Sequence, residues 1–290
     1  MNHVVLVGGS GYVGQAFQEI LTKRNISFRN FSRKEINYYN PAKLKAALSA
    51  EKPDALINAA GYTGKPNVDA CETDKANCLL GNAVLPGILR EVCEDLDISW
   101  GHVSSGCIYT GNRTDGTGFT EEDEPNFNFR TNNCSFYSGT KALGEEVLED
   151  ASKCYVWRLR IPFDERNNPR NYLSKLMNYE WLLDAENSIS QRFEYVNACI
   201  DSFTKKIPYG IYNVTNPGST TAREITKTMT DHGLITKELK FFDSEEEFMS
   251  RAAKTPRSNC LMSSEKLSDA GIQLSEVGEA IENACRDWVA

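Results

Sequence analysis

The stretch His3-Val-Val-Leu-Val-Gly-Gly-Ser-Gly-Tyr-Val-Gly14 decides the fold of this chain of 290 residues. Residues His3–Val7 form a short apolar run rich in β-branched side chains, which predicts a buried strand. A glycine turn follows, and a helical pattern then extends from about Gly14 to Lys23. A strand that passes through a glycine turn into a helix is typical of parallel α/β folds.

The glycine turn itself indicates a ligand. Gly8, Gly11 and Gly14 have G-x-x-G-x-x-G spacing. Glycine lets the chain turn tightly and lets backbone N–H groups approach a pyrophosphate, while the helix N-terminus favours its negative charge. We therefore expect a dinucleotide to bind this turn and to contact Tyr12 and Val13 as well. A glycine turn without a ligand is the alternative interpretation.

The ends of the next two strands refine this prediction. A second strand near Ser27–Ser32 ends in Asn30-Phe-Ser-Arg-Lys34, where NAD sites usually place an acid for the ribose hydroxyls. Ser32 followed by Arg33 suits a 2′-phosphate instead, so NADPH is expected rather than NADH. A solvated basic turn is the alternative. Small residues that let a nucleotide pack against the backbone follow the third strand, Ala55–Asn58; they are Asn58, Ala59, Ala60 and Gly61.

Strands and helices alternate throughout the N-terminal half. Further strands are predicted over Ile98–Ser105 and Tyr155–Arg160, and helices over Pro41–Ala50, Asp69 to about Asp95 with a kink at Pro86, and Phe136–Leu148. The polar stretch Thr110–Asn133 reads as a long loop. Apolar strands separated by helices indicate a parallel sheet covered on both faces. We expect an α/β fold with a Rossmann-type doubly wound parallel sheet, whose ligands bind beyond the carboxyl ends of the strands.

Beyond Arg160 the alternation becomes irregular. One more strand is predicted near Gly210–Gly218, and helical patterns cover Ala222–His232 and Ser264–Val289. We expect residues 1–160 to form an NADP-binding domain and residues 161–290 to form mainly a smaller C-terminal substrate-binding lobe, with one return of the chain to the main sheet near 187–215.

Three residues form a predicted catalytic group. Tyr137 and Lys141 are four residues apart on a predicted helix, so they share a face, and Ser105 ends the preceding strand. A lone Y-x-x-x-K pair is usually a solvated helix face. Here it follows a cofactor turn and a strand-terminal serine in the order that carbonyl reduction needs.

On these residues the chain resembles the extended short-chain dehydrogenases/reductases. The resemblance implies that Tyr137 gives a proton to the carbonyl being reduced and that Ser105 binds the carbonyl oxygen. Lys141 would bind the nicotinamide ribose and lower the pKa of the tyrosine. A nearby cation favours a phenolate, and a general acid works best with its pKa near the operating pH.

Cys107 lies two residues beyond Ser105, so we expect it to face the same pocket. A ketone at carbon 4 of a sugar acidifies the protons on carbons 3 and 5. A cysteine whose pKa is lowered could remove such a proton, as an epimerase requires. A buried inert thiol is the alternative.

The segments GCIY, FYSGTKA, RLRIP, NNPRNYLSK, YNVTNPG and PRSN together resemble a narrower family over nearly the whole chain. It is the bifunctional UDP-4-keto-6-deoxyglucose 3,5-epimerase/4-reductase of UDP-rhamnose synthesis, which is similar to dTDP-4-dehydrorhamnose reductase. The resemblance implies that Cys107 and Lys175 serve epimerisation, that Arg160 contacts the cofactor, and that Asn171 contacts the substrate. Plant members have threonine where this chain has Ser105, which keeps the hydroxyl. GDP-fucose synthase shares the Ser-x-Cys arrangement but uses a histidine, which this chain lacks at that place.

Arg257 and Asn259 follow Pro256 and are candidates for the nucleotide diphosphate, because arginine forks match phosphate oxygens. A capped helix start is the alternative. Two other functions remain open for the chain. One is a reductase without epimerase activity, and the other is a non-catalytic NADP-binding regulatory subunit.

Composition limits the partners. A net charge of −8 argues against nucleic acid, and no apolar run reaches the length of a membrane span. The nine cysteines are an odd number without a CxxC pair, which indicates a reducing, cytoplasmic setting and no metal site. The N-terminus does not read as a signal peptide. We expect a UDP-sugar substrate supplied by an upstream 4,6-dehydratase. A homodimer is only the usual default for soluble homo-oligomers.

Overall fold

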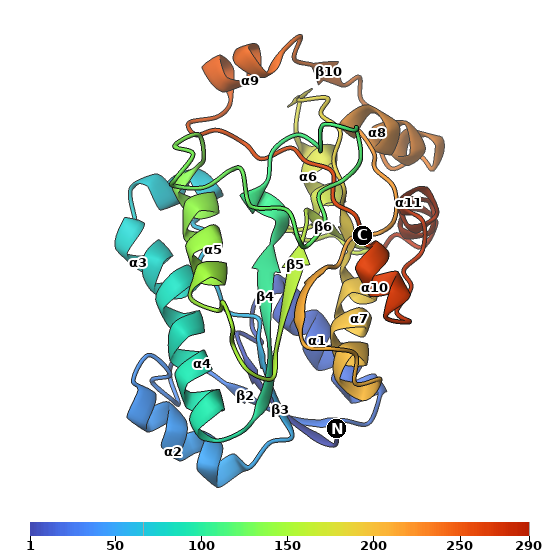
Figure 1. Cartoon of the computed structure of the whole chain (residues 1–290). Helices are drawn as coiled ribbons and strands as arrows, with labels where there is room; N and C mark the ends of the chain where they lie inside the picture. The colour runs from blue at the N-terminus through green and yellow to red at the C-terminus, as the bar shows by residue number, and fades with distance from the viewer. Residues whose placement is uncertain (66, 290) are drawn as a thin grey trace.

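A sheet of six parallel strands forms the centre of the molecule, in the order β2-β1-β3-β4-β5-β9 (Figure 1). The computed structural model describes residues 1–65 and 67–289. The strands are β1 (His3–Val7), β2 (Ser27–Phe31), β3 (Ala55–Asn58), β4 (Ser99–Ser105), β5 (Cys154–Leu159) and β9 (Gly210–Asn213). The chain moves from β1 to β2 and then back across to β3, so the strand order reverses beside β1. The predicted doubly wound parallel fold is confirmed.

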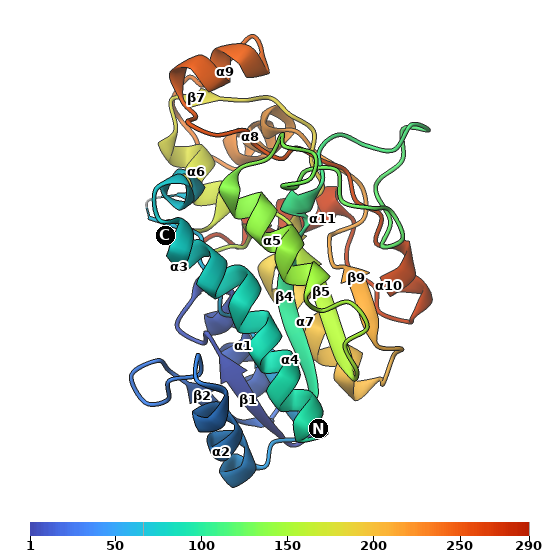
Figure 2. The same ribbon diagram turned by 60° about the vertical axis from the view of Figure 1, so that its left-hand side comes forward.

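Helices cover both faces of this sheet (Figures 1 and 2). One face carries α1 (Tyr12–Lys23) and α7 (Arg192–Thr204), and the other carries α2 (Pro41–Glu51), α4 (Leu85–Asp95) and α5 (Phe136–Glu146). Alternate residues of β1 enter opposite cores, since Val4 and Leu6 pack toward α1 whereas Val5 and Val7 pack toward α2 and α4. This explains why β1 is apolar throughout.

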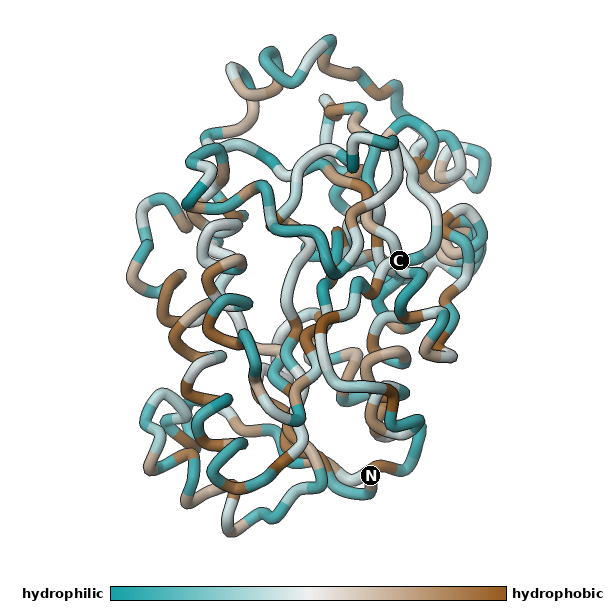
Figure 3. The backbone as a smooth tube through the Cα atoms, in the orientation of Figure 1, coloured by the Kyte–Doolittle hydropathy of each residue, from teal (hydrophilic) through white to brown (hydrophobic). Residues whose placement is uncertain are grey.

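Most of the remaining elements gather beyond the carboxyl ends of the strands, whereas the helix Glu265–Asp269 packs beside β9. The remaining elements are α6 (Tyr172–Asn178), α8 (Ala222–Asp231), α9 (Glu245–Arg251), α10 (Glu265–Asp269), α11 (Val277–Arg286) and the two-residue strands β6 (Pro162–Phe163), β7 (Trp181–Leu182), β8 (Ser190–Gln191) and β10 (Lys240–Phe241). A separate hydrophobic cluster forms between α6, α8 and α11. Figure 3 shows hydrophobic residues concentrated where helices meet the sheet.

Two predicted helices are interrupted. Residues 69–95 divide into a 3₁₀ segment η1 (Val68–Glu72), α3 (Lys75–Leu79), a π segment η2 (Leu80–Val84) and α4. Pro86 does not kink a helix, because it lies in the first turn of α4, where proline is tolerated. The pattern over Ser264–Val289 divides into α10 and α11, and α6, α7 and α9 were not predicted. In the described part of the chain no helix has the length and apolar character that a membrane crossing requires.

Candidate active site

The glycine turn between β1 and α1 fits a dinucleotide. Gly8 has φ +85°, and a Cβ there would lie 2.4 Å from the backbone nitrogen of Ala60. A Cβ at Gly14 would lie 2.1 Å from the carbonyl oxygen of Gly8. The N-cap of α1 is Gly11, which has no side chain to cap the first turn, so the backbone N–H groups there can receive an anion.

Neighbouring residues brace this turn. Tyr12 begins α1; its carbonyl oxygen accepts a bond from Arg192 at 2.9 Å, and the guanidinium lies 4.1 Å from the centre of its ring. Burial raises the pKa of Tyr12. Val13 packs against the core on the α1 side. Arg192 also forms a buried ion pair with Asp164, which sequence reasoning missed because 28 residues separate the two (192 − 164).

The end of β2 carries an acid that the sequence prediction did not include. The Ser32 hydroxyl donates to the Glu35 carboxylate at 2.9 Å, whereas Arg33 is exposed. The prediction examined residues 30–34 and stopped one position too early. The cofactor pocket expected here therefore combines a cation with a nearby carboxylate.

Asn58 forms part of the frame at the end of β3. Its side chain is fully buried, its Oδ1 accepts from the Ala60 amide at 3.0 Å, and its Nδ2 lies 2.9 Å from His102 Nδ1. Ala59 and Ala60 are half-buried and Gly61 is exposed. Burial lowers the pKa of His102 far below its usual value, so the imidazole is neutral.

The structure brings Ser105, Cys107, Tyr137 and Lys141 together where β4 ends and α5 begins. Ser105 ends β4, and the 3₁₀ turn η3 (Gly106–Ile108) carries Cys107, whose amide donates to Ser105 Oγ at 3.3 Å. Lys141 is 5% exposed, and its Nζ donates to the carbonyl oxygen of Val103 at 3.1 Å.

Burial dominates the electrostatics of the tyrosine and the lysine. It raises the pKa of Tyr137; Cys107 adds to the increase, and the Ser105 hydroxyl opposes it. Burial also lowers the pKa of Lys141, against the effects of Cys107 and Glu145. The expected net lowering of the tyrosine pKa is therefore wrong for this structure, because a phenol shielded from water ionises less readily.

Cys107 behaves in the same way. Its side chain is 6% exposed, and burial raises the pKa of the thiol. The neighbours Ser105, Ser138, Lys141 and Arg160 all act to lower that pKa but do not outweigh burial. The lowered pKa that a base would need is not found here, although each of these four neighbours favours the ionised form of the thiol.

Lys175 lies on α6. Burial lowers the pKa of its ammonium group, and Arg170 lowers it further, which makes the group a stronger acid than a free lysine. Arg160 lies beside η3, since a Cβ at Gly106 would lie 3.4 Å from its Cδ, and its guanidinium lowers the pKa of both Cys107 and Tyr172.

Two other predicted residues, Arg160 and Asn171, have structural partners. Arg160 binds the Ser258 carbonyl oxygen and Asn187 Oδ1, the latter at 2.6 Å, so it contacts the C-terminal segment instead of the cofactor turn. Asn171 is fully buried and caps α6; its amide nitrogen donates to Asp164 and to the Arg166 carbonyl oxygen. Its hydrogen-bonding groups are therefore occupied, and the predicted contact with substrate is not supported.

Arg257 and Asn259 line the same C-terminal segment. The Arg257 guanidinium forks onto the Asp69 carboxylate at 2.6 and 2.9 Å. Asn259 Oδ1 accepts from Asn187 at 3.2 Å. The Asp69 carboxylate therefore occupies the guanidinium of Arg257, which the sequence predicts to bind a diphosphate.

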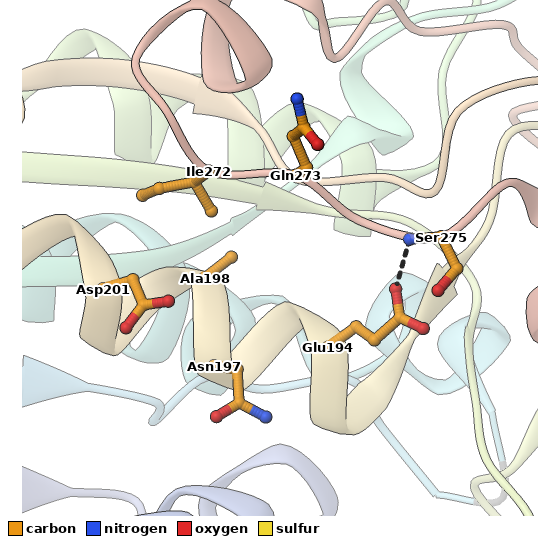
Figure 4. Close-up of a pocket in the computed structure, with 7 residues that line it drawn as sticks. All are labelled: Glu194, Asn197, Ala198, Asp201, Ile272, Gln273 and Ser275. Atoms are coloured by element: carbon orange, nitrogen blue, oxygen red, sulfur yellow. Dashed lines mark hydrogen bonds between the residues drawn. The ribbon is translucent and has the colours of Figure 1, made fainter.

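Two cavities lie away from this cluster. One of about 240 Å³ lies between α7 and the loop that precedes α11, and its lining includes Glu194, Asn197 and Asp201 (Figure 4). The other, of about 340 Å³, lies between α1, α7 and α11. Neither is lined by a residue predicted to be catalytic, so the chemistry is assigned to the cluster at the end of β4. No group of His, Cys, Asp and Glu suited to a metal ion occurs in residues 1–65 and 67–289.

A buried ion pair anchors α5 to the sheet and was not predicted. Arg158 on β5 bonds Glu145 on α5 at 2.8 Å, with side chains only 3% and 7% exposed. The Ser104 hydroxyl also donates to Glu145, at 2.5 Å. Glu145 lies four residues after Lys141, on the same helix face, so this pair holds α5 against β4 and β5.

Arg158→Met is expected to destabilise the protein by about 3–5 kcal/mol, because it leaves the buried Glu145 charge without its partner. The measurement is the free energy of unfolding in urea. Arg130→Met is the matched control, since its partner Glu146 lies in an exposed pair at 2.6 Å, worth at most about 1 kcal/mol. Equal losses in the two variants would contradict the assigned role of Arg158.

The family model described as the RmlD substrate binding domain matches residues 1–289. The chain belongs to this RmlD family. It is 30% identical over 282 residues to the bifunctional dTDP-4-dehydrorhamnose 3,5-epimerase/dTDP-4-dehydrorhamnose reductase of Arabidopsis thaliana, covering 96% of this chain and 90% of that protein. Membership confirms the predicted class, an enzyme of the short-chain dehydrogenase/reductase type.

Three further relatives are longer than this chain or share its fold at lower sequence identity. The chain spans about two fifths (40%) of the trifunctional UDP-glucose 4,6-dehydratase/UDP-4-keto-6-deoxy-D-glucose 3,5-epimerase/UDP-4-keto-L-rhamnose-reductase RHM1 of Arabidopsis thaliana, at 30% identity over 96% of this chain. The L780 UDP-rhamnose synthase of Acanthamoeba polyphaga mimivirus has the same fold, with a TM-score of 0.89 and 23% identity over 98% of this chain and 99% of that one. The dTDP-4-dehydrorhamnose reductase of Bacillus anthracis, solved with NADP, has a TM-score of 0.82 and 20% identity over 97% and 98%.

Proposed function

We propose that this chain epimerises carbons 3 and 5 of UDP-4-keto-6-deoxyglucose and then reduces the ketone at carbon 4 with NADPH, giving UDP-rhamnose. The observation that carries the proposal is the position of Cys107. It follows Ser105 in one turn at the end of β4, beside Lys141 and Tyr137. Relatives whose names include both activities support the same assignment. The UDP group rests on resemblance alone.

NADPH, when bound, supplies the hydride for carbon 4. The glycine turn and the open N-terminus of α1 would hold its pyrophosphate, with Arg33 near the 2′-phosphate. Lys141 would bind the ribose of the nicotinamide half. Asn58 keeps the end of β3 rigid beneath the nucleotide through its bonds to Ala60 and His102.

Reduction needs a proton donor at the ketone oxygen. Ser105 holds this oxygen, and the Tyr137 hydroxyl gives it a proton as carbon 4 is reduced. The raised pKa of Tyr137 keeps the phenol protonated at neutral pH and thus ready to donate. Tyr137 as a whole residue is partly exposed, so substrate can approach it.

Epimerisation needs a base and an acid on opposite faces of the sugar. The Cys107 thiolate removes the proton from carbon 3 or carbon 5, and the electron pair moves onto the carbon 4 oxygen, where Ser105 and Tyr137 stabilise it. Lys175 returns a proton to the other face, helped by the burial that lowers the pKa of its ammonium group. One proton leaves and one returns at each carbon.

Arg33→Ala is expected to raise the KM for NADPH about tenfold while the KM for NADH changes less than twofold, because an arginine contact to phosphate is a charge-assisted hydrogen bond. Initial rates with each cofactor at saturating sugar provide the measurement. Equal changes for both cofactors would mean that Arg33 does not contact the 2′-phosphate.

Epimerisation is expected to become faster as the pH rises from 7 to 9, about tenfold per unit, because burial raises the pKa of Cys107 and only the thiolate is a base. Reduction of UDP-4-keto-rhamnose, which is already epimerised, should not follow this slope, because Tyr137 stays protonated. Proton exchange at carbons 3 and 5 without NADPH is the measurement. A flat profile would exclude a thiolate base of raised pKa.

Reduction without epimerisation is the second candidate. The raised pKa of Cys107 favours it, since a protonated thiol removes no proton. Incubation with NADPH and UDP-4-keto-6-deoxyglucose, followed by identification of the sugar, distinguishes the two candidates. UDP-rhamnose supports the bifunctional enzyme, and an unepimerised 6-deoxy sugar supports the reductase. In either case a 4,6-dehydratase must make the substrate. A homodimer remains the default expectation for the assembly.

A further inference from the structure

The carboxylate of Glu72 joins three segments that are far apart in the sequence. Glu72 ends η1 and is half-buried. Its Oε1 accepts a bond from the Phe136 backbone amide at 2.8 Å and another from the Thr255 hydroxyl at 3.0 Å. The three residues are otherwise separated by 64 and 183 positions. One side chain therefore links η1, the start of α5 and the C-terminal segment.

Phe136 is the first residue of α5 and directly precedes Tyr137. The first turn of this helix has no acidic residue of its own, although helix N-termini favour negative charge. The N-cap Ser135 accepts from the Ser138 amide, which leaves the Phe136 amide for another acceptor. Glu72 provides that acceptor from outside the helix, so it fixes the turn from which the Tyr137 side chain projects.

Thr255 begins a segment that we name the strap, Thr255–Cys260. Asp69 of η1 binds the Arg257 fork, and Ser258 donates to the Tyr109 carbonyl oxygen at 2.5 Å. The Cys260 thiol contacts the Gly106 carbonyl oxygen at 3.5 Å, within the turn that carries Cys107. Figure 1 shows this part of the chain, after α9, passing over the first turn of α5 toward the end of β4.

We propose that Glu72 is a positioning residue for reduction: it holds the first turn of α5, and with it the Tyr137 hydroxyl, in a fixed position relative to the strap. This rests on the proposed function, because Tyr137 is the proposed proton donor. Positioning of this kind has large effects on rate, since a misplacement of about 1 Å can cost about a hundredfold. The proposal requires the length of the side chain and its two accepted bonds, not its charge.

Two variants separate length from charge. Glu72→Gln keeps an oxygen that accepts both bonds, whereas Glu72→Asp keeps the charge but is too short to reach both donors. We expect Glu72→Asp to lower kcat for reduction about 10- to 100-fold with the KM for NADPH within about twofold, and Glu72→Gln to stay within about threefold of the wild type.

Glu224→Asp is the matched control. Glu224 at the start of α8 also accepts one backbone amide, from Thr221 at 2.9 Å, and one threonine hydroxyl, from Thr220 at 3.2 Å. Shortening this side chain in Glu224→Asp should leave kcat for reduction unchanged. Backbone hydrogen exchange over residues 134–140 gives a second measurement that needs no substrate, and the Phe136 amide should exchange at least tenfold faster in Glu72→Asp than in the wild type or Glu72→Gln.

The outcomes are distinct. A wild-type protein without turnover would overturn the proposed function, and the exchange of the Phe136 amide would then decide the position of Glu72 alone. Wild-type turnover together with an unchanged kcat in Glu72→Asp would overturn the positioning role and leave the proposed function standing. A kcat lost in Glu72→Gln but kept in Glu72→Asp would show that charge, not position, is what matters, which also overturns the proposal.

Discussion

Tyr137→Phe is expected to lower kcat for reduction about a thousandfold, because removal of a positioned general acid typically costs about 10²–10⁴ in rate. The ring keeps its packing, so the dissociation constant for NADPH should change less than twofold. Oxidation of NADPH with UDP-4-keto-rhamnose, which needs no epimerisation, measures the effect directly.

Tyr195→Phe is the control for this change. Tyr195 is a buried tyrosine of α7 whose hydroxyl donates to the Trp157 carbonyl oxygen at 3.1 Å, away from the cluster at the end of β4. It should lose about 1 kcal/mol of stability and no kcat. A Tyr137→Phe variant with the activity of the wild type would contradict the proposed reductase and favour a non-catalytic NADP-binding protein.

Cys107→Ala is expected to slow proton exchange at carbons 3 and 5 by about 10²–10⁴, because it removes the proposed base. Reduction of UDP-4-keto-rhamnose should stay within about threefold of the wild type, since Ser105, Tyr137 and Lys141 remain. If Lys175 returns the proton, Lys175→Met should likewise lose epimerisation and keep the reduction of UDP-4-keto-rhamnose. Exchange followed by nuclear magnetic resonance in deuterated water measures the first activity, and NADPH absorbance measures the second.

Cys285→Ala controls for the loss of a buried thiol, since Cys285 lies on α11 among hydrophobic residues. Full exchange in Cys107→Ala would show that the thiol is not the base, and that Cys107 is a buried thiol whose raised pKa keeps it protonated. Loss of both activities would instead indicate that the turn η3 had been disturbed.

The parts of the molecule that the sequence could predict are those governed by local chemistry. The apolar run of β1, the glycines after it and the i, i+4 spacing of Tyr137 and Lys141 each depend on residues within a few positions of one another, so their pattern is visible in one dimension. The predicted strands of the sheet all form, with bounds that differ by a few residues at most on the N-terminal side of Arg160.

The missed features depend on contacts across the fold. The π segment η2 forms where Asn82 bonds the Tyr62 backbone and Thr140, partners that no local pattern reveals. Helix α7 begins with Arg192, whose buried charge is neutralised by Asp164. The guanidinium of Arg192 also lies over the Tyr12 ring. From the sequence alone, a charged residue such as Arg192 is expected to lie on the solvent-exposed surface.

The candidate site shows the same limit. Sequence spacing correctly placed Cys107 beside Ser105 and Tyr137, but it could not reveal that the thiol is almost fully buried, and burial determines its pKa. Asn171 was chosen from a motif, whereas the structure uses its amide to cap α6 and to bind Asp164. Glu72 had no signal at all, because its two partners come from the start of α5 and from the strap.

The central claim is that one chain performs both steps, and the most direct test is to run the reaction in deuterated water with NADPH and UDP-4-keto-6-deoxyglucose. Carbons 3 and 5 exchange their protons with solvent during epimerisation, whereas carbon 4 receives hydride from NADPH. We predict UDP-rhamnose with deuterium at carbons 3 and 5 and ordinary hydrogen at carbon 4. A reduced sugar with the original configuration and no deuterium at carbons 3 and 5 would contradict the account and leave a reductase alone.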